Sequence, residues 1–251
     1  MPAMTSFSTP SVHVCPGCGS FFLRRRLRSA NFFGAQDWSD GVPTMWWRQE
    51  PLVRCEACAA LFWLDDIEQV GTMPQRPKKM GRLTRAWLGW RGDPGGQLQN
   101  QEEWAKAMES WGHAQYIGGV SFDDVAYVLA RSKCVSSDQL LWLRNRIWWG
   151  LNDRYRTQVD GTPLSGVPTW PSAVERSNME AILDILRDDE VKPSYMIQKG
   201  ELLRLLGRFD EAVSVLRAVP PDGFSELRAL KIEKLAFSGD TQVRQLSPGT
   251  W

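Results

Sequence analysis

Four cysteines in two Cys-x-x-Cys pairs place the strongest constraint on how this chain folds. The pairs are Cys15-Pro-Gly-Cys18 and Cys55-Glu-Ala-Cys58. Two residues between cysteines let both thiolates converge on one ion, and four thiolates fill a tetrahedral coordination shell without leaving a position for water. The sequence therefore predicts a structural zinc site, formed by Cys15, Cys18, Cys55 and Cys58, that holds a small zinc ribbon together.

These cysteines have other conceivable uses. A disulfide framework is typical of short secreted chains, whereas this chain has 251 residues, five cysteines and no apolar signal segment after Met1. A redox pair needs a single Cys-x-x-Cys, and two such pairs, with Pro16 and Gly17 inside the first, favour a metal. Rubredoxin-like iron is the alternative to zinc. The fifth cysteine, Cys134, is expected to be a small buried apolar residue.

The ribbon is expected to be enlarged. Its two cysteine pairs are separated by 36 residues, whereas compact ribbons have about 15 to 20. The excess predicts an inserted loop with turn-forming residues in the segment Trp38-Ser-Asp-Gly41. Strand-forming residues flank the pairs, and a three- or four-stranded ribbon is expected from segments 12–14, 20–27, 45–48, 52–54 and 60–64.

Helical periodicity dominates the second half of the chain. Apolar residues recur there at three- and four-residue steps, as on amphipathic helices. The expected helices are 102–110, 122–131, 137–155, 172–187 and 224–238. Ser137 is the expected N-cap of the third. Before them, glycines and prolines in 71–98 indicate a linker with a short helix at 83–88.

Residues 195–216 have the spacing of a helical hairpin. Its key positions are Gly200, Leu203, Gly207, Phe209, Ala212 and Leu216. We expect Gly200 and Ala212 to allow close helix approach, and Gly207 to end the first helix. The segment resembles one tetratricopeptide repeat, although Lys199 stands where that repeat usually has an apolar residue.

The chain as a whole resembles bacterial proteins of uncharacterised function that join a four-cysteine ribbon, a Trp-Ser-Asp-Gly segment and a short tetratricopeptide-like tail. That resemblance implies a fold and no activity. Together with the motifs it predicts an α+β protein, in which a small N-terminal β zinc ribbon precedes an all-α, TPR-like helical domain. The expected parts are a flexible tail at 1–10, a ribbon with an inserted loop at 11–70, a basic linker at 71–98, and a helical domain at 99–251 with its TPR-like hairpin at 194–218.

Charge and hydropathy narrow the functional classes. The chain has 30 Lys and Arg residues against 29 Asp and Glu, for a net charge of +1, but residues 76–91 carry six basic residues and no acidic one. No apolar run approaches the about 20 residues that span a bilayer, and no targeting peptide is visible. We therefore expect a cytoplasmic protein without a membrane partner.

Catalytic motifs are missing from the sequence. It has two histidines, of which His13 is expected at an exposed strand position and His113 in an ordinary hydrogen-bonded role. No metalloprotease, nucleophile-elbow, phosphate-loop or dinucleotide motif is present. The expected function is a non-enzymatic, zinc-binding adaptor or scaffold, and an enzyme with an unrecognised site is a further alternative.

Two groups of residues are candidate contact surfaces. Tryptophans are enriched at protein interfaces, and the expected protein partner would contact Trp38, Trp46 and Trp47 or the groove of the helical domain. Clustered arginines beside phenylalanines are typical of nucleic-acid-binding ribbons. A nucleic-acid-binding zinc-ribbon regulator is therefore the alternative, acting through Arg24, Arg25, Arg26 and Arg28.

Overall fold

The structure is a computed structural model of the whole chain. It describes residues 6–29, 36–42, 50–77, 81–93, 96–131, 136–157, 162, 164, 166–186 and 192–247. Trp46, Trp47, Cys134 and the strand expected at 45–48 lie outside these described residues. Among the helices that are described, none is long and apolar enough to cross a membrane.

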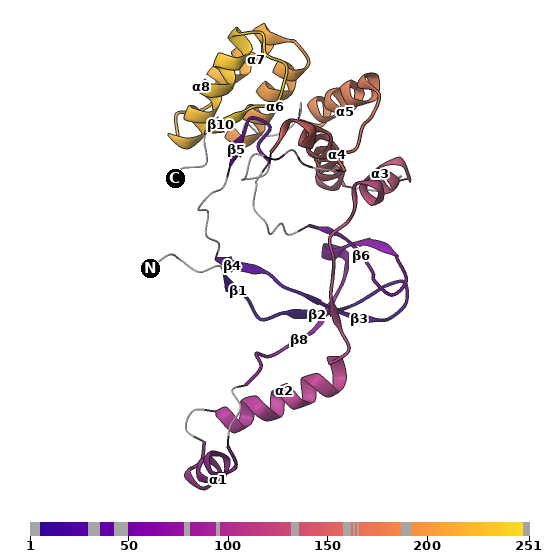
Figure 1. Cartoon of the computed structure of the whole chain (residues 1–251), viewed down its shortest axis with the longest axis vertical. Helices are drawn as coiled ribbons and strands as arrows, with labels where there is room; N and C mark the ends of the chain where they lie inside the picture. The colour runs from indigo at the N-terminus through magenta and orange to yellow at the C-terminus, as the bar shows by residue number, and fades with distance from the viewer. Residues whose placement is uncertain are drawn as a thin grey trace. The chain divides into compact units, whose positions relative to one another are not determined.

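The chain forms two compact units; Figure 1 labels their helices and strands and colours them by residue number. Unit 1 contains Met1–Asn31 and Trp47–Val120, and unit 2 contains Phe32–Trp46 and Ser121–Trp251. A β region that carries the cysteines and a helical C-terminal region confirm the α+β class. The division differs from the expected boundaries in two places, because residues up to Val120 belong with the β region and the inserted loop belongs with the helices.

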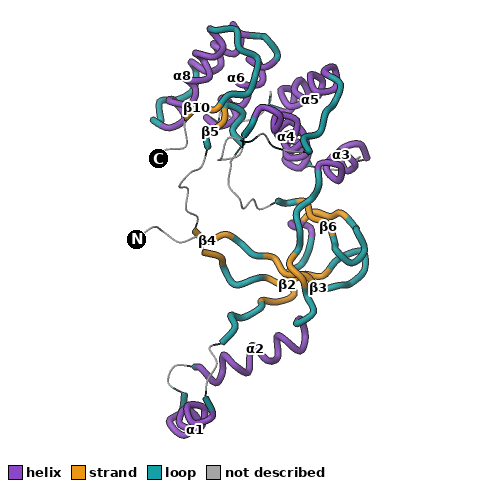
Figure 2. Tube along the Cα trace, viewed as in Figure 1, coloured by secondary structure: helices purple, strands orange, loops and turns teal. Residues whose placement is uncertain are grey.

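Unit 1 is built from short strands (Figure 2). Strands β8 (Gln69–Thr72), β2 (Ser11–Val14), β3 (Phe21–Arg24) and β9 (Gln115–Tyr116) form one sheet in that order, with β3 and β9 parallel. Strands β6 (Leu52–Arg54) and β7 (Leu61–Trp63) form a hairpin that precedes the 3-10 helix η1 (Leu64–Asp66), and β1 (Ser6–Phe7) pairs with β4 (Leu27–Ser29). Residues 71 and 72, expected in the linker, therefore extend this sheet.

Two helices complete unit 1, α1 (Arg82–Arg91) and α2 (Gln97–Trp111). Asp93 lies just before α2, and its carboxylate accepts two of the first backbone N–H groups of the helix, from Gln97 at 2.8 Å and Leu98 at 2.7 Å. At its other end, α2 lies against β8. A Cβ atom on Gly71 would come within 2.3 Å of the Trp111 ring, so this contact requires glycine on the strand.

Unit 2 is mostly helical. Its helices are α3 (Phe122–Arg131), α4 (Ser137–Asn152), α5 (Ser172–Ile185), α6 (Pro193–Leu205), α7 (Phe209–Arg217) and α8 (Phe224–Phe237), with the 3-10 helix η2 (Asp153–Tyr155) after α4. The N-cap of α4 is Ser136 and not Ser137 as expected. Ser136 forms a capping box with Gln139, which lies three residues further on as that motif requires.

The hairpin of α6 and α7 has the packing that its sequence predicts. Gly200 allows close approach, because a Cβ atom there would lie 2.5 Å from Leu216. Ala212 is fully buried at the same interface, and Gly207 has a φ of +78°, which favours glycine after the end of α6. Leu202, Leu203 and Leu206 then join the core of the unit.

The segment between the two cysteine pairs is bound into unit 2. Strand β5 (Asp37–Trp38) pairs with the C-terminal strand β10 (Gln245–Ser247). Asp40 is buried, and its carboxylate forms an ion pair with Arg156 and accepts a hydrogen bond from Asn152 at 2.9 Å. Trp149 donates its indole N–H to the Asp40 carbonyl at 3.1 Å. The expected ribbon insertion is thus a structural part of the helical unit.

Candidate metal centre

The two cysteine pairs lie in turns of the same conformation. One joins β2 to β3 and the other joins β6 to β7. In the first turn, Cys15 donates its N–H to the Ser20 carbonyl at 2.9 Å and its own carbonyl accepts from Gly19 at 2.9 Å. In the second, Cys55 makes the same two bonds with Ala60 and Ala59, at 2.9 and 2.8 Å. Each pair is therefore presented by a β-hairpin knuckle.

The residue after each knuckle has a positive φ, +74° at Gly19 and +59° at Ala59. That region suits glycine, and a residue with a side chain adopts it at a cost of about 1 to 2 kcal/mol. Ala59 adopts it nonetheless, because the turn must reverse sharply enough to bring Cys58 back toward Cys55. The second hairpin thus keeps the geometry of the first where its sequence does not favour it.

An offset of 40 residues relates the two hairpins, since Cys15, Cys18 and Phe22 correspond to Cys55, Cys58 and Phe62. The two phenylalanine rings meet in the core beside the site, with centroids 5.6 Å apart. Val53, Leu64, Cys15 and Cys55 belong to the same buried cluster. This internal repeat was missed by the sequence reasoning, although the shared spacing from cysteine to phenylalanine signals it.

The four sulfur atoms converge. All Sγ atoms lie within 4.8 Å of one another, with Cys15 and Cys58 3.7 Å apart and Cys18 and Cys55 3.8 Å apart. A tetrahedral ion with metal–sulfur bonds of about 2.3 Å places its sulfurs about 3.8 Å apart. The predicted ligand set therefore comes together in a geometry that fits one metal ion. Either zinc or iron suits a site of four sulfurs.

Burial and hydrogen bonds distinguish the four thiols. Cys15 and Cys55 are buried, whereas Cys18 and Cys58 are exposed. Hydrogen bonding with the side chain and the backbone of Ser20 lowers the pKa of Cys18 to about 6, while burial raises the pKa of Cys15. The Ala60 N–H lowers the pKa of Cys58, but hydrogen bonding to the neighbouring cysteines raises it to about 12. The raised pKa values of Cys15 and Cys58 favour their protonated forms, and a bound cation would have to displace those protons.

His13 corrects an expectation, because it is 3% exposed instead of lying on the surface. Strand β2 is inside its sheet, between β8 and β3, and the imidazole stacks on Phe22 with centroids 5.5 Å apart. Its Nε2 atom is hydrogen-bonded to the Ser11 hydroxyl at 2.9 Å. Burial, followed by the nearby Arg24, lowers the pKa of His13, so the neutral ring is favoured.

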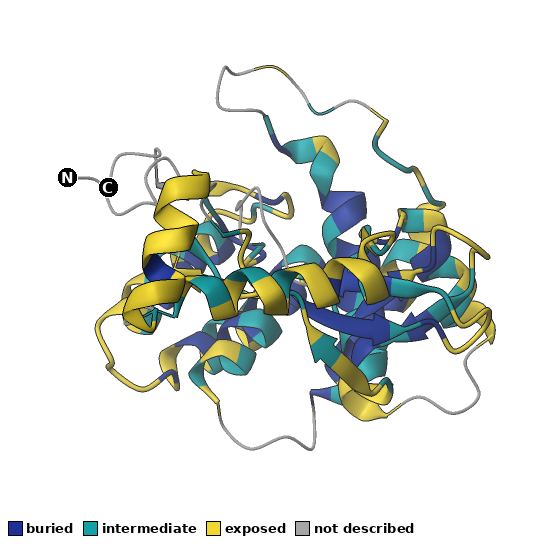
Figure 3. Ribbon diagram, turned by 90° about the horizontal axis from the view of Figure 1, so that it is seen from below, coloured by how far each residue is buried: buried dark blue, intermediate teal, exposed yellow. Residues whose placement is uncertain are grey.

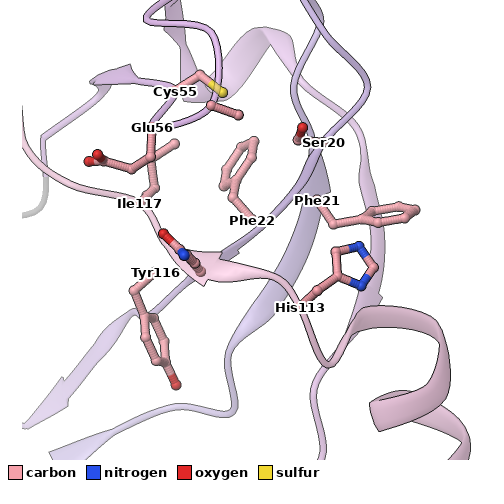
Figure 4. Close-up of a pocket in the computed structure, with 10 residues that line it drawn as sticks. Ser20, Phe21, Phe22, Cys55, Glu56, His113, Tyr116 and Ile117 are labelled. Atoms are coloured by element: carbon pink, nitrogen blue, oxygen red, sulfur yellow. The ribbon is translucent and has the colours of Figure 1, made fainter.

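An open pocket of about 280 Å³ adjoins the second knuckle (Figure 4). Phe22 and Ile117 project into it, and Glu56 lies at one side. His113 is exposed on the other side, where its ring meets the edge of Phe21 at 5.8 Å between centroids. Figure 4 shows the Tyr116 ring pointing away from the knuckle.

The expected arginine cluster divides between the sheet and the surface. Arg24 on β3 is half-buried, and burial lowers its pKa, whereas Arg25, Arg26 and Arg28 are exposed. Arg25 lies 4.0 Å from the centroid of the Tyr116 ring and donates to its hydroxyl at 2.8 Å. Phe22, one of the phenylalanines beside these arginines in the sequence, is buried in the core and offers no stacking surface.

Trp38, a candidate partner-binding residue, has a different environment from the one expected. Its side chain is 4% exposed, because β5 pairs with β10 and the ring lies 5.8 Å from the guanidinium carbon of Arg156. Arg228 donates to its backbone carbonyl. A ring enclosed in this way packs inside unit 2 and has little surface to offer a partner. The other two candidates, Trp46 and Trp47, lie outside the described residues.

Comparison with known proteins found no match for this chain among family models, curated proteins or solved structures.

Proposed function

We propose that this protein is a non-enzymatic adaptor, in which a Zn²⁺ ion stabilises unit 1 and unit 2 binds a helix of another protein along α8. The observation that carries the proposal is a stripe of exposed apolar side chains on α8. Leu227, Leu230 and Phe237 are 60%, 46% and 65% exposed. Side chains of this kind are individually common on surfaces, but aligned ones indicate a contact face.

Helix α8 has two apolar faces. On its inner face Ala229 and Ile232 are buried against Leu216 and Val219, and Ala236 is also buried. These contacts account for the attachment of α8 to the helical hairpin. The exposed stripe lies on the other side of the helix, so the fold of unit 2 itself does not require it.

The spacing of the stripe suits a second helix. Leu227, Leu230, Lys234 and Phe237 follow the i, i+3, i+7, i+10 pattern of the contact seam in a coiled coil. A lysine at one such position favours an acidic residue on the partner helix and fixes the register of the pair. A terminal helix of stacked hairpins also presents the face that a further hairpin would cover. The partner segment is therefore proposed to be an amphipathic helix with an acidic residue opposite Lys234.

Zinc is proposed as the resident metal. Four cysteine ligands complete its tetrahedral shell, and a closed shell of this kind serves structure and leaves no position for a substrate. Iron in a rubredoxin-like site is the alternative that metal analysis would detect.

A photocrosslinking experiment tests the adaptor proposal. A photoreactive residue at Leu230 is expected to capture one protein in native cell extract, and its crosslinked peptide should be an amphipathic helix. The same residue at Val174 of α5, which is 44% exposed, is the matched control. With the partner purified, L227E should weaken binding at least about tenfold, since burying a leucine is worth about 1.5 to 3 kcal/mol. Equal capture from both positions, or unchanged binding by L227E, would contradict the proposal.

Nucleic-acid binding by unit 1 is a second candidate, favoured by its charge. Unit 1 has 13 Lys and Arg residues against nine Asp and Glu, whereas unit 2 has 17 against 20. Arg25, Arg26 and Arg28 are exposed on the basic unit. Nuclease treatment of the extract before purification separates the two candidates, because a protein partner of α8 survives digestion and partners held through nucleic acid do not.

A further inference from the structure

Helix α1 carries an unexplained apolar surface. It attaches to α2 on one side, where Leu88 is 4% exposed and Arg85 donates to the Gln101 side chain at 2.5 Å. Leu83 and Trp90 are 88% and 86% exposed, and Trp87 is 49% exposed. Nearly the whole helix has the colour of exposed residues in Figure 3. Two tryptophans and a leucine therefore face away from the core of unit 1.

These three residues share one face of the helix. At about 100° per residue, Leu83, Trp87 and Trp90 fall within an arc of about 60°. Arg82 and Arg91 border this stripe, one on each side, and all charged residues of α1 are arginines. The Arg91 guanidinium lies 4.9 Å from the centroid of the Trp87 ring. The exposed surface of α1 is thus an apolar stripe between two cations.

We propose that α1 docks on the surface of an anionic phospholipid bilayer, with its axis parallel to the membrane. Tryptophan rings favour the boundary between headgroups and acyl chains, and leucine enters the apolar side of that boundary. Arginines flanking the stripe are placed to reach anionic headgroups while their stems remain against the lipid. Leu83 favours lipid over nucleic acid, because an aliphatic side chain offers no ring for a base to stack on.

This inference is independent of the adaptor role and revises the expectation of no membrane partner. That expectation rested on the lack of a bilayer-spanning segment, which a helix lying on the surface does not need. Helix α1 has 10 residues, so a single copy provides weak, reversible attachment. The positive charge of unit 1 adds attraction to an anionic surface, and binding is expected to weaken as salt screens it.

The test is co-sedimentation of the full-length, metal-loaded protein with vesicles. Phosphatidylcholine vesicles are compared with vesicles that also contain roughly one third phosphatidylserine. We expect sedimentation with the anionic vesicles only. The variant L83S/W90S should reduce partitioning by about tenfold or more, and R82Q/R91Q by about fivefold per arginine. Both sets of side chains are exposed, so circular dichroism and metal content should stay unchanged.

Matched variants elsewhere distinguish binding through α1 from nonspecific adsorption of the protein to vesicles. L227S/F237S removes exposed apolar residues from α8, and K192Q/K234Q removes two exposed cations from unit 2; both should sediment like the parent protein. The proposal is overturned if the parent protein does not sediment with anionic vesicles, or if L83S/W90S sediments like the parent. A fluorescent single-stranded oligonucleotide provides a further test. The proposal is also overturned if this oligonucleotide prevents vesicle binding and if its own binding to the protein requires Leu83 and Trp90.

Discussion

Unit 1 and unit 2 are stabilised in different ways. Unit 1 has strands of two to four residues, and its buried cluster includes two of the four cysteines of the candidate metal site. Unit 2 packs its helices around a continuous apolar core that includes Leu141, Trp148, Ile182 and Leu202. The short strands beside the cysteines bury little apolar surface, and the four clustered thiols offer a metal site as a further constraint. A metal is therefore expected to control the folding of unit 1 and to have little effect on unit 2.

Removing a cysteine ligand should have the largest effect. In C58S, unit 1 should lose its metal and unfold, since metal binding contributes on the order of 10 kcal/mol to such a unit. The fifth cysteine provides the control, because C134S should keep one metal per chain. Elemental analysis and limited proteolysis measure the outcome. A C58S protein whose unit 1 resists proteolysis would show that the cluster is not the main constraint.

Asp40 tests whether the two units are stabilised separately. It lies between the two cysteine pairs in sequence, but its buried carboxylate forms contacts within unit 2. D40A should destabilise unit 2 by about 3 kcal/mol, since Arg156 loses its fully buried ion-pair partner and keeps only Asp153, whose side chain is partly exposed. Metal content should stay unchanged. D210A, at an exposed position in the first turn of α7, should cost only about 0.5 kcal/mol. Urea unfolding followed by helical circular dichroism distinguishes them, and equal midpoints would contradict the role of Asp40.

Glycine substitutions compare packing in the two units. G200A should destabilise unit 2 by about 1 to 3 kcal/mol, because its Cβ would overlap Leu216. In α1, a Cβ at Gly89 meets nothing within 4 Å, so G89A should be neutral or stabilise the helix by about 0.5 to 1 kcal/mol. Thermal unfolding of both variants measures the difference. A stable G200A protein would mean that the helices of the hairpin can separate without cost.

The smallest effect is expected at the start of α4. S136A removes the hydroxyl that accepts the Gln139 N–H at 3.2 Å and should cost about 1 kcal/mol. S137A removes a neighbouring hydroxyl that does not cap the helix, and its midpoint in urea should match that of the parent protein. If S137A were the more damaging variant, Ser137 would be the cap that its sequence position suggests.

Local patterns predicted the elements more accurately than their assembly. Cysteine spacing predicted the ligand cluster, and helical periodicity predicted α3 with its observed bounds, because both signals lie within a few residues. The place of Trp38 and Asp40 in unit 2 depends on Arg156 and β10, more than 100 residues away. The burial of His13 likewise depends on β8, a strand more than 50 residues away of which residues 71 and 72 were expected in a linker. Contacts of such sequence separation leave no periodic signal.

Hydrogen exchange measured by mass spectrometry tests the central claim most directly, by comparing metal-loaded protein with protein treated with a chelator. We predict that chelation removes protection from residues 11–24 and 52–63, while α4, α6 and α7 exchange as slowly as before. Protection that persists in the two cysteine hairpins after the metal is removed, or that is lost equally from both units, would contradict the account.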